Sequence, residues 1–480
     1  MQAARSLVEH WVESGETIYG VTTGFGEFST VRIGVNDLES LQQNLILSHS
    51  AGVGEPIPPE VVRAMMLLRA NVLAKGYSGV RPDFVEFLVK MLNGDVVPVV
   101  PQQGSVGSSG DLVPLAHLGL AMMGKGTVWV GDGKKGYRKV SARQGLRKLR
   151  LRPIRMAAKE GVALINGTQM MTAYAALAVY QAKALCKIAD IAAAMSIETL
   201  KGSDTAFDER LHAVRPYKGQ QASARNLRML IEKSSIRESH RYGDPRVQDA
   251  YSLRCAPQVH GASRDAIEYA EGIISVEINA ATDNPLIFVE DGQHIEGGNF
   301  HGQPVALASD FMAIALAELA SISERRIDQM MHSELPELPK FLTRHGGLNS
   351  GMMMTQYVAA SLVSENKVLS HPASVDSIPT SAGKEDHNSM GSIAAQKLWR
   401  VLKNTQTVLG LELLVSAQGL DFHRPLRSGK GVEAAHRRIR QKIRHLDEDR
   451  VLAEDIQTAL RLVTSGELLN AVEGSIGQLL

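Results

Sequence analysis

The chain of 480 residues is long enough for about three domains of ordinary size. Its 52 basic and 51 acidic residues leave a formal net charge of +1, which argues against nucleic acid or a membrane surface as a partner. Only Cys186 and Cys255 are present, too few for a disulfide framework or a four-thiolate zinc site. The N-terminal segment carries charges throughout and shows no apolar signal sequence. We therefore expect a cytoplasmic protein with a small-molecule partner.

The first clear local signal is a glycine-rich loop, residues 104–111, that runs directly into an apolar helical pattern. Its small residues favour a tight turn, and Ser109 or Asp111 is expected to cap the helix. A phosphate-binding loop requires Lys after the second Gly, whereas Asp111 follows Gly110. The nucleophile elbow G-x-S-x-G also fails, because Asp111 stands where Gly is needed.

Few stretches have the alternation of a strand. The sequence predicts strands within residues 126–133 and 285–298, each beside a turn rich in Gly and Asp. Residues 134–155 carry ten Lys or Arg and no acid. Because Tyr137 is the only aromatic residue there, a solvated hairpin and short helix, or a subunit contact, is favoured over a nucleic-acid patch.

Long helical patterns dominate the rest of the chain, over residues 168–202, 303–332 and about 388–418. Helices of about 30 residues reach ~45 Å, so they predict an elongated bundle. With 5% aromatic residues, these helices must pack through Ala, Leu, Met and Val. Apolar residues on more than one face indicate oligomerisation. We expect a mainly α fold with two domains, residues 1–167 and 168–480.

The loop sequence "GSVGSSGDLVPLAH" resembles the signature of the aromatic amino-acid ammonia-lyases and aminomutases. In that family Ala-Ser-Gly cyclises by itself into the electrophile 4-methylidene-imidazol-5-one (MIO). The resemblance implies that Gly110 supplies the ring nitrogen, Ser108 the carbonyl and Ser109 the methylene. A glycine nitrogen, unhindered by a Cβ, can approach the carbonyl two residues back. Ser108 stands where the family usually has Ala, and since its side chain lies outside the ring, we expect cyclisation to proceed.

Matching segments recur in the family's order along nearly the whole chain. They are "YGVTTGFG" (19–26), "LQQNLILSHSAGVGEP" (41–56), "ALINGTQ" (163–169), "VQDAYSLRCAPQVHGA" (247–262), "GGNFHGQP" (297–304), "GLNSGMM" (347–353) and "SENKVLSHPASVDSIPTSAGKEDHNSM" (364–390). The resemblance implies a homotetramer of long helical bundles whose active sites each draw on three subunits. It places the prosthetic group in a small N-terminal domain poor in α/β structure.

The resemblance also implies roles for single residues. Tyr19, in a mobile loop, corresponds to the catalytic base, for which a lowered phenol pKa is expected. Tyr251 corresponds to a second tyrosine beside the electrophile, and Arg254 to the residue that binds the substrate carboxylate bidentately. Asn166 is expected to contact the ring or substrate and also to cap the following helix. The other substrate-binding residues implied are His49, Gln248, Asn299, Phe300 and Met353.

Histidine is the substrate that the selectivity positions favour. The resemblance places Ser48 and His49 on one side of the substrate ring and Glu385 opposite, where a carboxylate can bind an imidazole N–H. The expected products are trans-urocanate and ammonia. One alternative is a tyrosine or phenylalanine lyase or an aminomutase, favoured by Thr22. Another is a non-catalytic helical homologue that fails to cyclise, suggested by Ser108 and the short N-terminal segment.

A metal site is not expected. Six acidic and histidine residues could suggest a metal cluster, but they show no H-E-x-x-H pattern, and the implied reaction needs no metal. These residues are Glu296, His371, Asp376, Glu385, Asp386 and His387.

Overall fold

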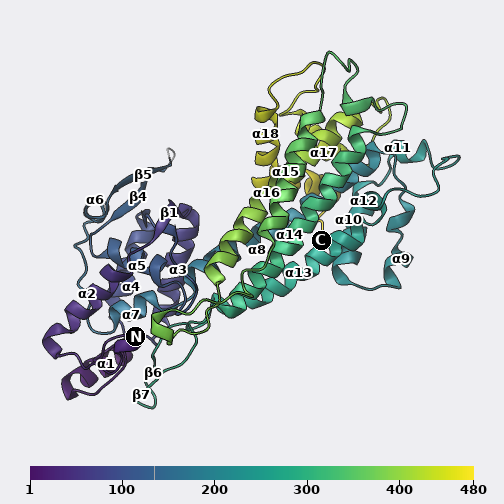
Figure 1. Ribbon diagram of the computed structural model, residues 1–480. Coiled ribbons are helices and arrows are strands. Elements are labelled where there is room, and N and C mark those ends of the chain that lie inside the picture. The colour runs from purple at the N-terminus through teal and green to yellow at the C-terminus, as the bar shows by residue number, and fades with distance from the viewer. Residues whose placement is uncertain (134–135) are drawn as a thin grey trace. The chain divides into compact units, whose positions relative to one another are not determined.

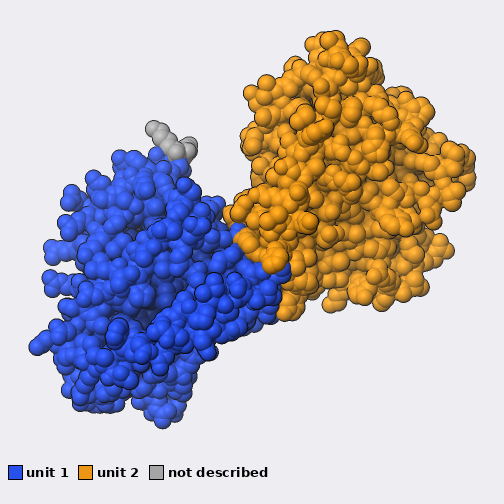
Figure 2. Space-filling view, in the orientation of Figure 1, with its two compact units in different colours: residues 1–177, 272–310, 372–396 blue, residues 178–271, 311–371, 397–480 orange. Residues whose placement is uncertain are grey.

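The computed structural model describes residues 1–133 and 136–480, which group into two compact units (Figure 2). Unit 1 comprises residues 1–177, 272–310 and 372–396, and unit 2 comprises residues 178–271, 311–371 and 397–480. The sequence predicts two consecutive domains divided after residue 167. The observed grouping differs because the chain returns twice to unit 1.

Short and medium helices make up most of unit 1 (Figure 1). Proline opens both α3 and α4, where its missing N–H costs no hydrogen bond. Gly15 ends α1 in the left-handed conformation. The helices are α1 (Gln2–Ser14), α2 (Leu38–His49), α3 (Pro59–Ala74), α4 (Pro82–Asn93), α5 (Leu112–Met122), α6 (Ala142–Lys148) and α7 (Glu160–Ile165), with 3-10 turns η1 (Gly26–Phe28), η2 (Val35–Asp37) and η5 (Ser381–Gly383).

Three small antiparallel sheets belong to unit 1 within the described ranges. Both predicted strand regions are confirmed: residues 126–133 contain the middle strand of one sheet, and residues 285–298 form a hairpin. Alternation along the middle strand buries Val128 and Val130. The sheets are β1 (Val53–Pro56) with β3 (Pro101–Gln103), β2 (Val96–Pro98) with β4 (Thr127–Gly131) and β5 (Tyr137–Ser141), and β6 (Leu286–Phe288) with β7 (Gln293–Ile295).

The predicted long helices are confirmed, with ends within a few residues of the expected ones. Their apolar residues are mainly Ala, Leu, Ile, Met and Val. Four unit boundaries fall inside these helices and inside α13, and the fifth lies after α15, between His371 and Pro372. The bounds are α8 (Gln169–Thr199), α13 (Ala256–Glu277), α14 (Gln303–Met331) and α16 (Gly391–Asp421). The mainly helical fold expected from the sequence is therefore what the structure shows.

The parts of the long helices that lie in unit 2 are joined by buried charged groups. Arg326 of α14 forms an ion pair with Glu412 of α16, and the Ser196 hydroxyl of α8 donates to the same carboxylate. His260 Nδ1 of α13 lies 2.7 Å from Asp190 of α8. Pairing offsets the desolvation of these groups. The other elements of unit 2 are α9 (Glu209–Ala213), α10 (Lys218–Leu230), α11 (Ser235–Glu238), α12 (Tyr251–Arg254), α15 (Met353–Leu369), α17 (Lys430–Arg440), α18 (Leu452–Thr464) and α19 (Glu467–Ile476), with η3 (Thr205–Phe207) and η4 (Lys340–Leu342).

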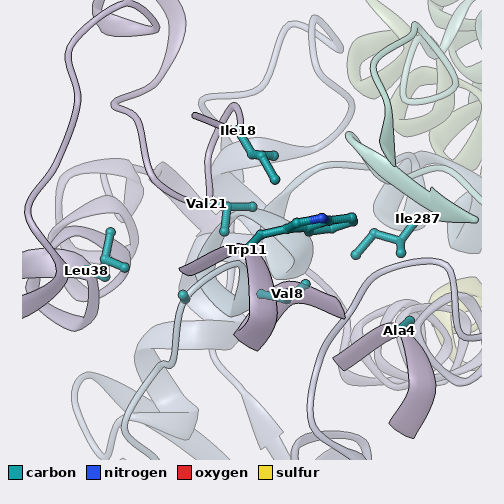
Figure 3. Packing of buried hydrophobic residues seen from close by; sticks show 8 residues of the cluster. Ala4, Val8, Trp11, Ile18, Val21, Leu38 and Ile287 are labelled. Atoms are coloured by element: carbon teal, nitrogen blue, oxygen red, sulfur yellow. The ribbon is translucent and has the colours of Figure 1, made fainter. Parts of the chain in front are cut away.

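The N-terminal helix α1 forms a small core beneath the segment that carries Tyr19 (Figure 3). Trp11 of α1 packs in one buried cluster with Ile18 and Val21, which flank Tyr19 on both sides, and with Ile287 of β6. Apolar anchors on either side of an exposed or half-exposed residue fix where its side chain can point. The segment around Tyr19 is thus anchored by buried apolar side chains on both sides.

The basic segment 134–155 has the expected form where it is described. Residues 134 and 135 lie outside the described residues; Tyr137–Ser141 forms β5 and Ala142–Lys148 forms α6. Ser141 caps α6 with a capping box shared with Gln144. The hairpin with exposed charges agrees with the solvated interpretation.

One described helix, α14, is long and apolar enough to cross a membrane by length and composition alone. Its most apolar window is 67% buried inside the protein, and a buried core helix has the same properties. This helix is therefore weak evidence for a membrane span.

Asp111 caps a different helix from the one predicted. It precedes α5 but makes no side-chain bond to it. Its Oδ2 instead accepts from the N–H groups of Met170 and Met171 in the first turn of α8, at 2.8 and 3.0 Å, and its Oδ1 accepts from the Ser392 hydroxyl. The reason is tertiary: Gly110 pairs with Gly167, which brings the start of α8 beside Asp111.

We predict that Asp111→Ala lowers the free energy of unfolding by about 2 kcal/mol, because it leaves buried N–H groups at the start of α8 without an acceptor. Urea-induced unfolding followed by circular dichroism measures the change. The exposed turn residue Asp291 provides the control variant Asp291→Ala, which is expected to unfold like the unsubstituted protein. Equal stability of both variants would contradict the capping role.

Candidate active site

The Ser108–Ser109–Gly110 loop is held by backbone pairing with Gly167. The Gly167 N–H donates to the Ser109 carbonyl at 3.2 Å, and the Asp111 N–H donates to the Gly167 carbonyl at 2.7 Å. Gly110 has φ +78°, and a Cβ on it would collide with the Gly167 carbonyl. Only glycine combines this conformation with so close a backbone approach. The two bonds fix the chain on both sides of Gly110.

The start of α16 supports the same loop from another direction. The Ser389 hydroxyl donates to the Gly107 carbonyl at 2.9 Å, and the Met390 N–H donates to the Val106 carbonyl at 2.9 Å. The Ser105 hydroxyl donates to the Gly110 carbonyl at 3.3 Å, and its oxygen lies 2.7 Å from the Ser392 hydroxyl oxygen. Segments distant in sequence therefore determine the shape of the loop.

The loop residues fit the cyclised group that the sequence implies. Gly110 has no Cβ, so its nitrogen is open to approach the Ser108 carbonyl carbon, and the surrounding backbone already holds a tight turn. Ser108 and Gly110 are buried, whereas Ser109 is only half-buried. The residue that would carry the methylene is thus the accessible one of the three.

Glu385 lies beside Ser109. The Ser109 hydroxyl donates to Glu385 Oε1 at 3.1 Å, and the Thr380 hydroxyl donates to Oε2 at 2.5 Å. Thr380 and Glu385 also pair through their backbones across η5. The carboxylate is therefore oriented toward the loop by its own turn.

The Tyr19 phenol lies near the same carboxylate, and its pKa corrects the sequence-based expectation. Burial raises the pKa of Tyr19 above its ordinary value of 10.0, and the charges of Glu296 and Glu385 raise it further. The Gly26 N–H, which donates to the phenol oxygen at 3.3 Å, lowers it in part. The expected lowering is wrong for this chain by itself, because burial disfavours the charged phenolate and the nearby carboxylates are negative.

His49 is the last residue of α2. It stands at the predicted selectivity position, and the structure brings it near Glu385. Burial lowers the pKa of His49 below its ordinary value of 6.5, and the Leu45 carbonyl and the Glu385 charge oppose this in part. The ring Nδ1 lies 3.0 Å from the Ser48 hydroxyl. A neutral imidazole can donate with one nitrogen and accept with the other, which suits a polar ligand.

Asn166 does not cap α8, contrary to the sequence-based expectation. It follows the last residue of α7, and its side-chain Nδ2 donates to the Val162 carbonyl at 3.0 Å. Asp111 occupies the capping role at α8 instead, since its carboxylate accepts from the N–H groups of Met170 and Met171. Asn166 nevertheless adjoins Gly167 and hence the loop.

Asn299 and Phe300 are not joined to the loop by any hydrogen bond among the described residues. They lie between β7 and α14, with Asn299 exposed and Phe300 half-buried. Asn299 Nδ2 donates to the Ala281 carbonyl at 3.4 Å. Their roles at the site stay predictions.

A second cluster of expected site residues lies in unit 2, at α12. The Arg254 guanidinium donates to Gln248 Oε1 and to the Asp249 carbonyl, each at 3.0 Å, and lies 4.6 Å from the centre of the Tyr251 ring. Tyr251 is 71% exposed. These contacts hold the planar guanidinium in one orientation. Met353, the first residue of α15, is half-buried and also belongs to unit 2.

Sequence reasoning missed Arg69, a fully buried arginine of α3 behind the loop. It was detectable: Met65, Met66 and Leu73 occupy the apolar face of that helix, and Arg69 falls on the same face at helical spacing. A lone charge on a core face requires buried partners. Its contacts are described below.

A metal centre is not evident in the described part of the chain. Within residues 1–133 and 136–480, no group of three His, Cys, Asp or Glu side chains is placed to hold a metal ion.

A helical fold thus presents a glycine-pinned Ser-Ser-Gly loop whose accessible serine lies beside the Glu385 carboxylate, an arrangement suited to an enzyme site. A family model described as aromatic amino acid lyase matches residues 1–441. The chain is 55% identical over 465 residues to a histidine ammonia-lyase of Caldanaerobacter subterraneus subsp. tengcongensis, covering 97% of this chain and 90% of the relative.

Solved structures agree in fold. The crystal structure of histidine ammonia-lyase from Trypanosoma cruzi has a TM-score of 0.91 at 44% identity, covering 99% of this chain and 89% of that one. A tyrosine aminomutase from Streptomyces globisporus has a TM-score of 0.92 at 37% identity, covering 99% and 93%. The chain belongs to the aromatic amino acid lyase family, and it is an enzyme, a carbon–nitrogen lyase.

Proposed function

We propose that the protein is a histidine ammonia-lyase that converts L-histidine to trans-urocanate and ammonia with an MIO group made from Ser108, Ser109 and Gly110. The observation that carries this proposal is the loop itself, pinned by Gly167 and presenting Ser109 at 3.1 Å from Glu385. High identity to a relative named histidine ammonia-lyase supports the choice of substrate.

Ring formation needs no co-reactant. The Gly110 nitrogen forms a bond to the Ser108 carbonyl carbon, and that carbonyl oxygen leaves as water with two protons from the nitrogens. The Ser109 hydroxyl then leaves with the Ser109 Cα proton as a second water, which gives the exocyclic methylene. The pairing of Gly167 with residues on both sides of Gly110 favours the first step by holding the reacting atoms in a compact turn.

When formed, the MIO group supplies an electrophile that activates the substrate for loss of ammonia. The chain's own residues do the rest. Tyr19 accepts the β-proton at its phenol oxygen, once the ammonium group of the substrate offsets the negative charges that raise its pKa. Arg254 binds the substrate carboxylate with its preoriented guanidinium, and Tyr251 handles protons of the amino group.

Recognition of histidine rests on charge. Glu385 can accept a hydrogen bond from an imidazole N–H, and His49 offers a second polar partner. A phenyl ring in the same place would leave the carboxylate unpaired, which costs several kcal/mol. The alternative of a tyrosine or phenylalanine lyase or aminomutase retains support from the aminomutase fold. Thr22, the residue that favours it in the sequence, donates its hydroxyl to the Glu16 carbonyl.

We also propose a homotetramer whose sites combine residues of different subunits, and a cytoplasmic location in keeping with two unpaired cysteines. Ser109 and Glu385 belong to unit 1, whereas Tyr251 and Arg254 belong to unit 2. The large exposed fraction of the Tyr251 ring supports a role in contact with another chain.

The intact mass tests the MIO group. We predict that the purified protein is lighter than its sequence by two waters and that Ser109→Ala loses only one water and all activity, because its side chain has no hydroxyl to eliminate. Ser108→Ala is the matched control and should lose both waters and stay active. Lyase activity in a protein of unmodified mass would rule out this chemistry.

Substrate choice is tested by ultraviolet assays with histidine, tyrosine and phenylalanine in turn. We expect urocanate to form fastest and Glu385→Gln to lower kcat/KM for histidine at least ~10²-fold, because the amide is a weaker acceptor without charge. Asp386→Asn, an exposed neighbour with no assigned role, should change it little. Faster release of coumarate or cinnamate at equal concentration would contradict the histidine assignment but not the lyase.

Subunit sharing is tested by mixing two inactive variants, Tyr19→Phe and Arg254→Ala. Reassembled mixed tetramers should regain part of the activity, because some sites then contain both intact residues. Each variant dissociated and reassembled alone is the control. Absence of activity in tetramers shown by native mass spectrometry to have exchanged subunits would indicate sites built within one chain.

A further inference from the structure

Arg69 is a buried cation behind the Ser108–Gly110 loop, on the apolar face of α3. Its relative exposure is 0%. In the described part of the chain no carboxylate lies within 4.0 Å of its guanidinium, so its partners are neutral oxygens. Burial lowers the pKa of Arg69 to about 10, with the charge of Asp283 opposing this, and the side chain stays protonated at neutral pH. Burying a charged guanidinium without a carboxylate partner costs desolvation free energy, so we expect Arg69 to have a specific role.

The guanidinium holds the connection between α7 and α8. Nη1 donates to the Asn166 carbonyl and to Gln169 Oε1, each at 2.6 Å, and Nη2 donates to the Ala163 carbonyl. The two carbonyls belong to the C-terminal end of α7, where helix carbonyls lack partners within the helix. Gln169 is fixed in turn by its Nε2, which donates to Thr282.

Between these contacts lies the residue that pins the loop. Gly167 has φ +143°, and a Cβ on it would collide with Arg69 Nη1. On its other side Gly167 bonds the Ser109 carbonyl and the Asp111 N–H. The arrangement is a stack of three layers, with Arg69 behind, Asn166–Gly167 in the middle and Ser109–Gly110 in front.

We propose that Arg69 is a positioning residue for MIO formation, holding Asn166–Gly167 rigidly against Ser109–Gly110 so that the Gly110 nitrogen stays in reach of the Ser108 carbonyl. This inference rests on the proposed function, because it concerns the same ring. Ring closure depends on the fraction of time spent in a near-attack geometry, and a displacement of 1 Å can cost ~10²-fold in rate. If Gly167 moves more freely, the Gly110 nitrogen and the Ser108 carbonyl spend less time in that near-attack geometry.

The contacts made at position 69 depend on the planar, forked shape of a guanidinium. Its planar fork reaches the Ala163 and Asn166 carbonyls together, whereas a lysine ammonium is a single point charge on a flexible stem. Arg69→Lys therefore keeps the charge but loses part of the clamp. Arg69→Met keeps the apolar stem and the approximate volume and loses the clamp entirely.

The test follows the fraction of molecules lighter by two waters against time after synthesis, by intact mass spectrometry of the full chain. We expect ring formation to slow at least ~10-fold in Arg69→Met and by less in Arg69→Lys. Hydrogen–deuterium exchange of the segment 163–170 should rise in the same order. Circular dichroism reports whether each variant is folded.

Arg81→Met is the matched control. Arg81 pairs with the buried carboxylate of Glu160 at 2.8 Å, at the opposite end of α7, and has no contact with Gly167. Its loss leaves that carboxylate unpaired and destabilises the protein. The control therefore measures the effect of lower stability alone, and it should form the ring at the rate of the unsubstituted protein.

A folded Arg69→Met variant that cyclises at the unsubstituted rate would overturn the inference while the proposed function stands. If Arg69→Met does not fold, Arg69→Lys decides: slowed cyclisation with raised exchange supports the inference, and an unchanged rate overturns it. Equal slowing in Arg81→Met would assign the effect to stability and also overturn it. An unsubstituted protein of full sequence mass would instead contradict the proposed function, and this inference with it.

Discussion

The backbone pairing of Gly110 with Gly167 is the constraint on which the rest of the candidate site depends. Two segments more than fifty residues apart approach so closely that a Cβ on Gly110 would collide with the Gly167 carbonyl. The pairing gives the Ser108–Gly110 loop its shape and brings the start of α8 beside Asp111. The carboxylate then closes the arrangement by binding Ser392 of α16. The contact between Gly110 and Gly167 thus connects the loop to the long helices α8 and α16.

The segment that carries Gly167 is itself fixed by buried charges. Helix α7 has six residues, too few to be stable alone, and all of them are buried. Near its start, Lys159 pairs with Asp283 at 2.7 Å. At its end, Arg69 binds the carbonyls. Buried pairs add little net stability but strongly penalise other arrangements, so they define a single position for this short helix.

Local patterns predicted the long helices and both strand regions because periodicity and turn residues act over neighbouring positions. The helix that Asp111 caps and the pKa of Tyr19 could not be predicted in this way. The first depends on which helix the Gly110–Gly167 pairing brings near, and the second on the burial of the phenol and on the negative charges of Glu296 and Glu385. Residue motifs indicated which side chains matter, whereas their partners come from tertiary packing.

Each of the two groups of expected site residues is oriented by contacts within its own unit. This orientation does not depend on the association of subunits. In unit 1 the turn at Thr380 orients Glu385 toward Ser109, and in unit 2 the ring of Tyr251 and the amide of Gln248 orient Arg254. In the proposed tetramer, association then has to align two preformed surfaces rather than order flexible side chains. Ordering each long side chain on association costs about 0.5–1.5 kcal/mol. Because these side chains are already ordered within each unit, association of the subunits does not have to meet that cost, and more of the association energy remains for assembling the proposed site.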